Sequence, residues 1–360
     1  MPVPGTTLSQ TLDRLLDGQN LTEREAGKLL VELTAPELAP ALAGAVLAAL
    51  RLKGVTAAEL RGFAVAMRSL ARKPELPAAL RAVDIVGTGG DKSGSLNLST
   101  GAALLTAACG VPVVKHGNRS ISSRAGSADV LAALGLPLPL DERAAAECFA
   151  ATGFTFLFAP HYHPAMKSLA QVRATLGVRT VFNILGPLTN PAAPPFHVIG
   201  AYDLPTAELM AQALAGMGIE RALVVHGAEG WDEPTPIGPF EVFDVRGAEV
   251  RREQRDPADY GLAPCSAADL AGGDAAENAH ALRQILSGQL QGPQRDALLL
   301  GTALALEVTG VEPAPRLAMA RAAQAIDSGA AAALLVRLPR AAGAGGAAGA
   351  GAAAMEVPHD

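Results

Sequence analysis

The sequence predicts an α/β protein built from a small helical domain and a larger α/β domain, in which a mostly parallel sheet is flanked by helices. Three observations support this fold class. The chain has 360 residues, which is enough for two domains and a substantial core. Residues 1–75 have a helical pattern, and from about residue 80 short β-branched runs alternate with alanine-rich helical stretches. That alternation is typical of a parallel sheet covered by helices.

The small helical domain, residues 1–75, is predicted from its helix starts. Leucines and alanines recur at helical spacing, as at Leu29, Leu30 and Leu33. Three threonine–glutamate pairs have the spacing of a capping box, in which each side chain bonds the backbone of the other residue: Thr22/Glu25, Thr34/Glu37 and Thr56/Glu59. We therefore expect a helix to begin after each pair.

The larger domain, residues 80–160 and 181–338, is predicted from short apolar runs. The strand candidates are residues 82–86, 111–115, 154–159, 196–202 and 222–226, with a hairpin over 240–250. The helix candidates are residues 125–134, 205–217, 278–290 and 294–308. Residues 161–180 interrupt this pattern with a polar, helix-like segment that we expect to rejoin the N-terminal helices, leaving a cleft between the domains. Residues 341–360 are rich in alanine and glycine and are predicted to form a disordered tail.

Composition narrows the function classes. The net charge of −6 is unsuited to indiscriminate nucleic-acid binding, which needs a basic surface. The longest uncharged apolar run, residues 39–50, is too short to span a bilayer. The three cysteines, Cys109, Cys148 and Cys265, lie far apart without metal-ligand spacing, so we expect buried free thiols. These features indicate a globular enzyme of the reducing cytoplasm, with no nucleic-acid and no membrane partner.

The most informative motif follows the first predicted strand. Gly87, Gly89, Gly90 and Asp91 form a glycine-rich turn, and the polar stretch from Asn97 opens a helical pattern. Glycines let the backbone approach an anion, and the start of a helix offers unpaired N–H groups. The spacing fits neither the dinucleotide-binding motif nor the P-loop. The motif predicts phosphate binding, and a plain tight turn is the alternative.

Two further segments follow predicted strands. Residues 115–127 concentrate lysine, histidine, asparagine, arginine and serine side chains without an acidic residue. They would suit an anion with many oxygens, although a solvated basic loop is also compatible. Asp232 and Glu233 are adjacent carboxylates that, with Asp91 and Ser99, could supply oxygen ligands for Mg²⁺. Surface charge is the alternative for that pair.

The segment 161–180 carries two residues with binding chemistry. Arg173 follows His163 by ten residues, close to three helical turns, so one helix face could carry both. A helix-borne arginine that faces the cleft would suit a carboxylate, and a surface arginine is the alternative. The turn sequence of residues 183–191 is rigid, contains two prolines and is predicted to form a wall of the cleft.

Four segments together resemble one known family. They are DIVGTGGD with NLSTGAA, KHGNRSISSRAGSADVLAALG, FLFAPHYHPAMKSLAQVRATLGVRTVFNILGPLTNP, and HGAEGWDE. In this order they are similar to the anthranilate phosphoribosyltransferases of tryptophan biosynthesis, over roughly residues 8–335. The resemblance implies a helical domain hinged to the α/β domain, as in pyrimidine nucleoside phosphorylases, and transfer of 5-phosphoribosyl from phosphoribosyl pyrophosphate (PRPP) to the anthranilate amine. It also implies Mg²⁺, with two ions expected, and a homodimer formed through the helical domain.

The same resemblance implies roles for individual residues. Donor-binding roles fall on Gly87, Gly89, Gly90, Asp91, Asn97, Ser99, Thr100 and Lys115. Ser127 lies in the matching serine-rich loop, and Ser95, Gly117 and Ser127 are expected to bind substrate. Roles in binding anthranilate fall on Asn118 and Arg173, with His116 and His163 beside them. Metal-binding roles fall on Ser99, Asp232 and Glu233, and the expected catalytic residues are Lys115 and Arg173. The chain departs from the family at Ser95, where threonine is common.

Two other functions stay open from the sequence alone. A pyrimidine nucleoside phosphorylase would share the architecture and a related lysine–serine loop. A non-catalytic relative of the same fold would bind nucleic acid through a basic cleft. The paired carboxylates and the KHGN segment favour the transferase over the phosphorylase, and the acidic net charge argues against the nucleic-acid-binding relative.

Overall fold

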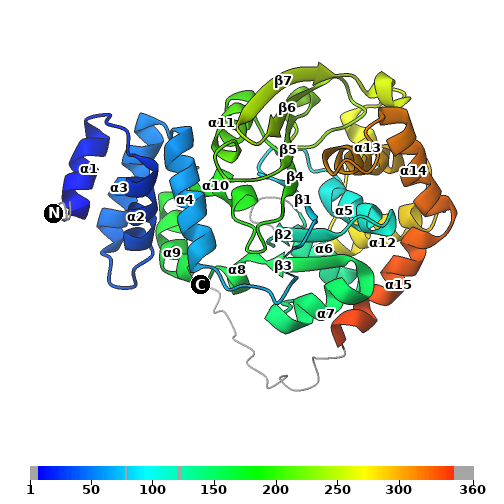
Figure 1. Cartoon of the computed structure of the whole chain (residues 1–360), viewed down its shortest axis with the longest axis horizontal. Coiled ribbons are helices and arrows are strands. Elements are labelled where there is room, and N and C mark those ends of the chain that lie inside the picture. Colours follow the sequence, from blue (N-terminus) through cyan, green and yellow to red (C-terminus); the bar gives the residue numbers. More distant parts are fainter. Residues whose placement is uncertain (1–6, 78, 120–123, 344–360) are drawn as a thin grey trace.

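A seven-stranded sheet forms the centre of the larger domain (Figure 1). The computed structural model describes residues 7–77, 79–119 and 124–343. The strands are β1 (Val83–Gly87), β2 (Val113–Gly117), β3 (Phe154–Phe158), β4 (Phe196–Gly200), β5 (Arg221–His226), β6 (Phe240–Arg246) and β7 (Glu249–Arg255). Their order is β3-β2-β1-β4-β5-β6-β7; the first five run parallel, and β6 and β7 are antiparallel. The predicted mostly parallel sheet is therefore confirmed.

The small helical domain lies beside this sheet and consists of the N-terminal helices with two later ones (Figure 1). These are α1 (Leu8–Leu16), α2 (Glu23–Leu33), α3 (Pro40–Lys53) and α4 (Ala57–Leu70), with α9 (Lys167–Leu176) against α3 and α10 (Phe182–Leu185) against α4. Capping boxes at Thr22/Glu25 and Thr56/Glu59 start α2 and α4, as predicted. The sequence interpretation missed a third capping box, at Thr7/Gln10, which starts α1.

The prediction that a helix begins after Thr34 is wrong. Thr34 ends α2 instead, and its hydroxyl donates to the carbonyl oxygens of Leu30 and Val31, both at 3.0 Å. The hydroxyl therefore satisfies the last turn of the preceding helix and is not available to cap the next one. The following helix, α3, begins only at Pro40, and its N-cap residue Ala39 makes no side-chain capping bond.

Helices cover both faces of the sheet, and the sheet separates two apolar cores. The remaining helices are α5 (Leu98–Ala108), α6 (Ser127–Ala133), α7 (Glu142–Thr152), α8 (Ala159–Tyr162), α11 (Leu204–Leu214), α12 (Ala275–Leu286), α13 (Pro293–Val308), α14 (Pro315–Asp327) and α15 (Ala330–Gly343). Alternate residues of β5 face different cores: Leu223 and Val225 pack with α5 and α12–α15, whereas Ala222 and Val224 pack with α11 and the small helical domain. The small helical domain thus shares a core with one face of the sheet.

Three details differ from the sequence interpretation. Strand β7 extends to Arg255, five residues beyond the predicted hairpin. Helix α15 continues to Gly343, so residues 341–343 are helical, and the rest of the predicted tail lies outside the described residues. All three cysteines are free, but only Cys148 is buried; Cys109 and Cys265 are partly exposed. Within the described ranges, no helix has the length and apolarity needed to cross a membrane.

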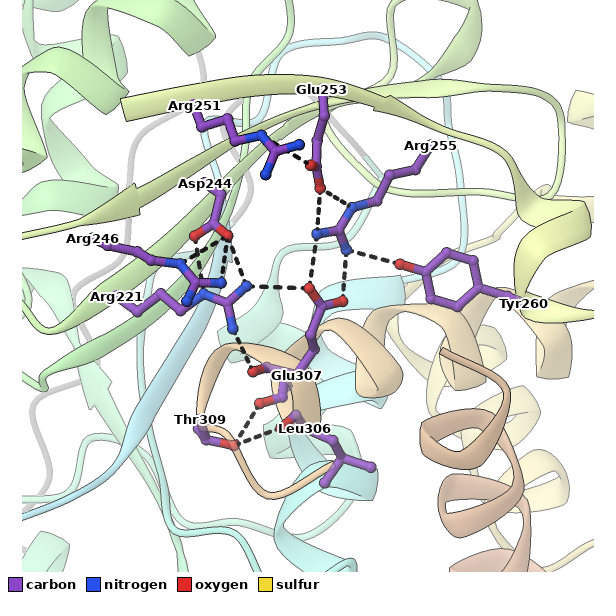
Figure 2. Close-up of polar contacts among 11 residues, drawn as sticks. Arg221, Asp244, Arg246, Arg251, Glu253, Arg255, Tyr260, Leu306, Glu307 and Thr309 are labelled. Carbon is purple, nitrogen blue, oxygen red and sulfur yellow. Dashed lines mark hydrogen bonds and ion pairs between the residues drawn. The ribbon is translucent and has the colours of Figure 1, made fainter. Parts of the chain in front are cut away.

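A network of ion pairs joins strands β5–β7 to α13 (Figure 2). Arg221 binds both carboxylate oxygens of Asp244, at 2.8 and 2.9 Å, and also contacts Glu307 at 3.2 Å. Arg255 binds both oxygens of Glu307, at 2.6 and 2.7 Å, and donates to the hydroxyl of Tyr260 at 2.9 Å. Because Arg221 is the first residue of β5, the network lies at the end of the sheet opposite the carboxyl ends of the parallel strands.

Candidate active site

The candidate site lies at the carboxyl ends of the parallel strands, where the chain changes direction across the sheet. The chain runs from β1 outward through β2 to β3 and then returns to β4 on the other side of β1. Ligands of open α/β sheets bind at such a switch point. Three of the strands that meet there end in glycine: β1 at Gly87, β2 at Gly117 and β4 at Gly200.

Two of these glycines make room for the loop after β5. Gly87 and Gly200 lie opposite each other in the sheet. A Cβ atom on Gly200 would lie 1.6 Å from the carbonyl oxygen of Asp232, and one on Gly87 would lie 2.4 Å from Oδ2 of Asp232. The missing side chains therefore allow Asp232 to lie directly over the strand ends. Gly200 was not among the predicted site residues, because a lone glycine at the end of an apolar run has no distinctive pattern.

The glycine turn after β1 closes onto Asp232. Gly89 and Gly90 have φ angles of 68° and 80°, in the region that favours glycine. The amide of Gly89 donates to Oδ2 of Asp232 at 2.5 Å. Asp91 accepts from the amide and the hydroxyl of Ser93, both at 3.0 Å, and Oγ of Ser93 lies 3.2 Å from Oγ of Ser95, whose hydroxyl can donate to it. The Gly89 amide is thus an anion receptor that a carboxylate of the chain itself occupies.

The start of α5 faces the second carboxylate of this pair. The amide of Ser99 donates to Oε1 of Glu233 at 3.1 Å. Asn97 is the N-cap residue, but its side chain donates to the carbonyl oxygen of Ala125 at 3.1 Å and accepts from Asn278 at 2.8 Å. An N–H group in the first helical turn is a natural anion receptor, and here Glu233 occupies it.

Thr100 is also in the first turn of α5 and is fully buried. Its hydroxyl oxygen has no hydrogen-bond partner within the described part of the chain.

Lys115 connects these groups from β2. Its side chain is buried, and Nζ donates to the carbonyl oxygen of Ile85 and, at 3.4 Å, to the hydroxyl of Ser99. Burial lowers the pKa of Lys115, while the carboxylates of Asp84, Glu233 and Asp232 raise it in part. The glycine turn, the start of α5, Lys115 and the carboxylate pair therefore form one continuous set of contacts.

The electrostatics of the carboxylate pair fit a divalent cation. Burial raises the pKa of Asp232 well above its usual value, and the nearby charges of Glu233 and Asp91 raise it further. Burial likewise raises the pKa of Glu233 to about 7. A bound cation would relieve this cost. Among the described residues, no group of three or more His, Cys, Asp or Glu side chains converges on a metal position. The donor set suits Mg²⁺, which takes one or two carboxylates and completes its shell with phosphate oxygens and water.

The loop after β2 brings a second group of predicted residues together. A Cβ atom on Gly117 would lie 2.5 Å from Oγ of Ser127, which donates to the carbonyl oxygen of Asn118 at 3.2 Å. The rings of His116 and His163 meet edge to face, with centroids 5.1 Å apart. Burial lowers the pKa of His116 to about 3 and that of His163 to about 4, so both rings are neutral at pH 7. Residues 120–123 of this loop lie outside the described residues.

Arg173 lies on α9, but His163 does not share that helix. His163 lies between α8 and a short 3₁₀ turn, and α9 begins only at Lys167, so the interpretation of one common helix face is wrong. Pro164 directly follows His163 and disfavours a helical conformation there. The guanidinium of Arg173 lies over the ring of Phe182, 5.4 Å from its centroid. Within the described residues, no carboxylate forms an ion pair with Arg173, so its charge is available to a ligand.

The structure adds Arg179 to the site. Its guanidinium donates to the carbonyl oxygen of Gly90 and lies 4.0 Å from the ring centroid of Tyr202. Arg179 therefore supports the glycine turn from the side of residues 161–180. Its position in the segment Gly177-Val178-Arg179 gives no hint of this contact, because the turn it supports lies 89 residues away in sequence.

Comparison with known proteins identifies the family of the chain. The family described as "Glycosyl transferase family, a/b domain" matches residues 79–332, and its helical bundle domain matches residues 9–71. The anthranilate phosphoribosyltransferase of Desulforudis audaxviator is 47% identical over 92% of this chain and 95% of that protein. The enzyme of the same name from Rhodospirillum rubrum is 45% identical over 94% and 96%.

Solved structures give the same result. The crystal structure of anthranilate phosphoribosyltransferase from Thermus thermophilus has a TM-score of 0.86 and 42% identity, covering 92% of this chain and 98% of that one. The Saccharomyces cerevisiae enzyme in complex with PRPP and Mg also has a TM-score of 0.86, with 26% identity over 94% and 98%. The chain therefore belongs to the glycosyl transferase family and, within it, to the anthranilate phosphoribosyltransferases.

Proposed function

We propose that the protein transfers the 5-phosphoribosyl group of PRPP to the amine of anthranilate and releases pyrophosphate, as a step of tryptophan biosynthesis. One observation carries the proposal: a continuous set of contacts joins the amide of Gly89, the start of α5, Lys115 and the pair Asp232/Glu233. This set combines anion receptors with oxygen ligands for a cation, which is what a metal-bound pyrophosphate requires.

The donor would bind on the side of β1 and α5. The Saccharomyces cerevisiae relative has been solved with PRPP and Mg, which supports the same donor and metal here. The proposed donor residues are Gly87, Gly89, Gly90, Asp91, Ser95, Asn97, Ser99, Thr100, Lys115, Gly117 and Ser127. Ser99, Asp232 and Glu233 would hold Mg²⁺, with two ions expected. Bound Mg²⁺ would neutralise the charge of the pyrophosphate group.

The chemistry is a substitution at the anomeric carbon of the sugar. The bond from this carbon to the pyrophosphate oxygen breaks, and its electron pair leaves with pyrophosphate. The lone pair of the anthranilate nitrogen forms the new bond, and the nitrogen then loses a proton to water. The N–H groups of the glycine turn and the ammonium of Lys115 would stabilise the departing anion. The aromatic amine is already neutral at pH 7, so we expect no enzyme nucleophile and no obligatory general base.

The acceptor would bind on the side of residues 161–180. Arg173, which forms no ion pair within residues 7–77, 79–119 and 124–343, suits the carboxylate of anthranilate, and Asn118 would help to orient its ring. The neutral rings of His116 and His163 would form an uncharged wall beside it. A relative from Saccharomyces cerevisiae has been solved with 4-fluoroanthranilate, which supports this acceptor class. Closure of the two domains about a hinge would align the substrates and exclude water, which could otherwise hydrolyse the donor.

We also propose that the protein is a homodimer that forms through its helical domain. Leu16, Val31, Leu52 and Val65 are exposed there, and Leu52 has 84% of its surface accessible. These four side chains come from α1, α2, α3 and α4 of one domain, and a contiguous patch of exposed apolar side chains marks an interaction surface. Light scattering on the purified protein would measure the mass, and a monomer at assay concentration would contradict the proposal. The three free thiols are consistent with the cytoplasm as its location.

One assay tests the activity directly. Anthranilate fluoresces, and its emission should fall when PRPP and Mg²⁺ are added to the purified protein. Omission of either should abolish the change, and incubation with thymidine and phosphate should release no thymine. Constant anthranilate fluorescence together with thymidine cleavage would favour the phosphorylase and refute the proposal.

A further inference from the structure

The ladder between the central strands β1 and β2 opens beside Lys115. Strand β1 pairs with β4 at five positions, and β2 pairs with β3 at five. Between β1 and β2, both of which are fully described, the register pair is Val83 with Val113 alone. If this register continued, Ile85 would lie opposite Lys115. The opening therefore starts one residue after the last paired position and faces the candidate site.

Side chains bond three backbone groups at this opening. In a regular parallel ladder, the backbone groups of residues 85, 114 and 116 would bond across the two strands. Here the carbonyl oxygen of Ile85 accepts from Nζ of Lys115. The carbonyl oxygen of Val114 accepts from Nδ2 of Asn190 at 2.8 Å, and the amide of His116 donates to Oδ1 of Asp84 at 3.2 Å. Each of these three backbone groups thus remains satisfied.

Asp84 and Asn190 form one buried unit. Nδ2 of Asn190 also donates to Oδ2 of Asp84 at 2.8 Å, and both side chains are completely inaccessible to solvent. Oδ1 of Asn190 accepts from the amide of Ala192 at 2.9 Å, which fixes its orientation. A buried carboxylate is costly: burial raises the pKa of Asp84 to about 6, although the charge of Lys115 counteracts this rise. An uncharged backbone ladder would avoid that cost.

The opening has a consequence for Lys115. Where the register pairing stops, its ammonium donates to the Ile85 carbonyl oxygen and lies 3.4 Å from the Ser99 hydroxyl at the start of α5. In a closed ladder the Ile85 carbonyl oxygen would also accept from the His116 amide, so Lys115 would share this anchor with the backbone. We propose that Asp84 and Asn190 are positioning residues for the transfer reaction: they bridge the opened strands and thereby fix Lys115 and the backbone of His116 at the donor site. This inference rests on the proposed function.

The test separates positioning from simple loss of stability. In Asn190→Ala, we expect the KM for PRPP to rise about tenfold or more, while the KM for anthranilate stays within about twofold. Asp84→Asn should act in the same direction, because its new NH₂ group would face the donor of Asn190. Since both changes break one bridge, the double variant should be no worse for PRPP than Asn190→Ala alone.

The matched control is Thr152→Val. The Thr152 hydroxyl is buried and bonds the carbonyl oxygens of Cys148 and Phe154, at 2.6 and 2.8 Å, away from the site. This variant should unfold at a lower temperature but keep both KM values. Calorimetric titration with PRPP and Mg²⁺ gives a second readout that does not need turnover, and Asn190→Ser provides a milder change if Asn190→Ala does not fold.

Three results would overturn the proposal: folded variants with unchanged PRPP affinity, equal rises in both KM values, or multiplied effects in the double variant. The proposal would also be overturned if both Asn190 variants failed to fold while Thr152→Val folded, because the Asp84–Asn190 bridge would then be needed for folding itself. A wild-type protein that binds PRPP without consuming anthranilate would contradict the proposed function, while loss of PRPP binding in the variants would still support the bridge.

Discussion

The buried histidine of β4 should make the protein sensitive to mild acid. His197 is fully inaccessible, and burial lowers its pKa from 6.5 to about 3, with the nearby guanidinium of Arg68 as a second cause. In the unfolded chain the imidazole takes up a proton near pH 6.5, whereas in the folded protein it stays neutral. Because the folded pKa is depressed, the stabilisation is present above pH 6.5 and is lost as the pH falls towards 3.

The size of the effect follows from these two pKa values. At pH 7 the imidazole is mostly neutral in both states, so the contribution of His197 is near its maximum. At pH 5 the unfolded form is almost fully protonated while the folded form is not, which costs about 2 kcal/mol of unfolding free energy. The variant His197→Gln removes this titration. Its unfolding free energy should therefore fall between pH 7 and pH 5 by about 2 kcal/mol less than that of the wild type.

Urea unfolding at pH 7, 6 and 5 measures this difference. Only the change in unfolding free energy between pH 7 and pH 5 is compared. The result therefore does not depend on how much His197→Gln destabilises the protein at neutral pH. His280→Gln, a change at an exposed position of α12, is the matched control and should keep the wild-type dependence. Parallel curves for the wild type and His197→Gln would refute the reasoning.

Three further predictions concern the acceptor side, the metal side and the ion-pair network around Glu307. Arg173→Ala should raise the KM for anthranilate about tenfold or more, because the substrate carboxylate loses a hydrogen bond to a charged group, while the KM for PRPP changes little. Equal rises of both KM values in steady-state kinetics would contradict this prediction. Asp232→Asn combined with Glu233→Gln should weaken the Mg²⁺ dependence of turnover, and an unchanged Mg²⁺ titration would remove both residues from the metal site. Glu307→Gln should lower the unfolding free energy by about 2 kcal/mol, because two partly buried arginines lose their charged shared partner. The KM values should not change, and urea unfolding with parallel kinetics would check both points.

The central strands and the glycine turn could be predicted because each has a strong local signal. The run ending at Val86 is apolar and is followed by three glycines within four residues. Convergence of the motifs could also be predicted, since the carboxyl ends of parallel strands meet at one edge of a sheet. The prediction ended β7 too early because its sequence, EVRREQR, is highly charged and lacks an apolar signal. Such a sequence suits an exposed edge strand.

The missed features depend on contacts between distant segments. Arg179 and Gly200 each lie next to residues that are far away in sequence, so neither stands in a recognisable motif. The Asp84–Asn190 bridge joins residues 106 apart, and in sequence the aspartate looks like part of a strand. Thr34 was assigned to the wrong helix because its hydroxyl can serve either the helix before it or the helix after it, and only the fold decides between them.

Glu233 on the Ser99 amide has a consequence for the order of ligand binding. The amide can receive this side chain or an incoming phosphate oxygen, but not both at once. A divalent ion that drew Glu233 towards itself would vacate the amide for the donor, so each ligand would favour arrival of the other by the same factor. A phosphate group that bound this amide would have to displace the Glu233 carboxylate.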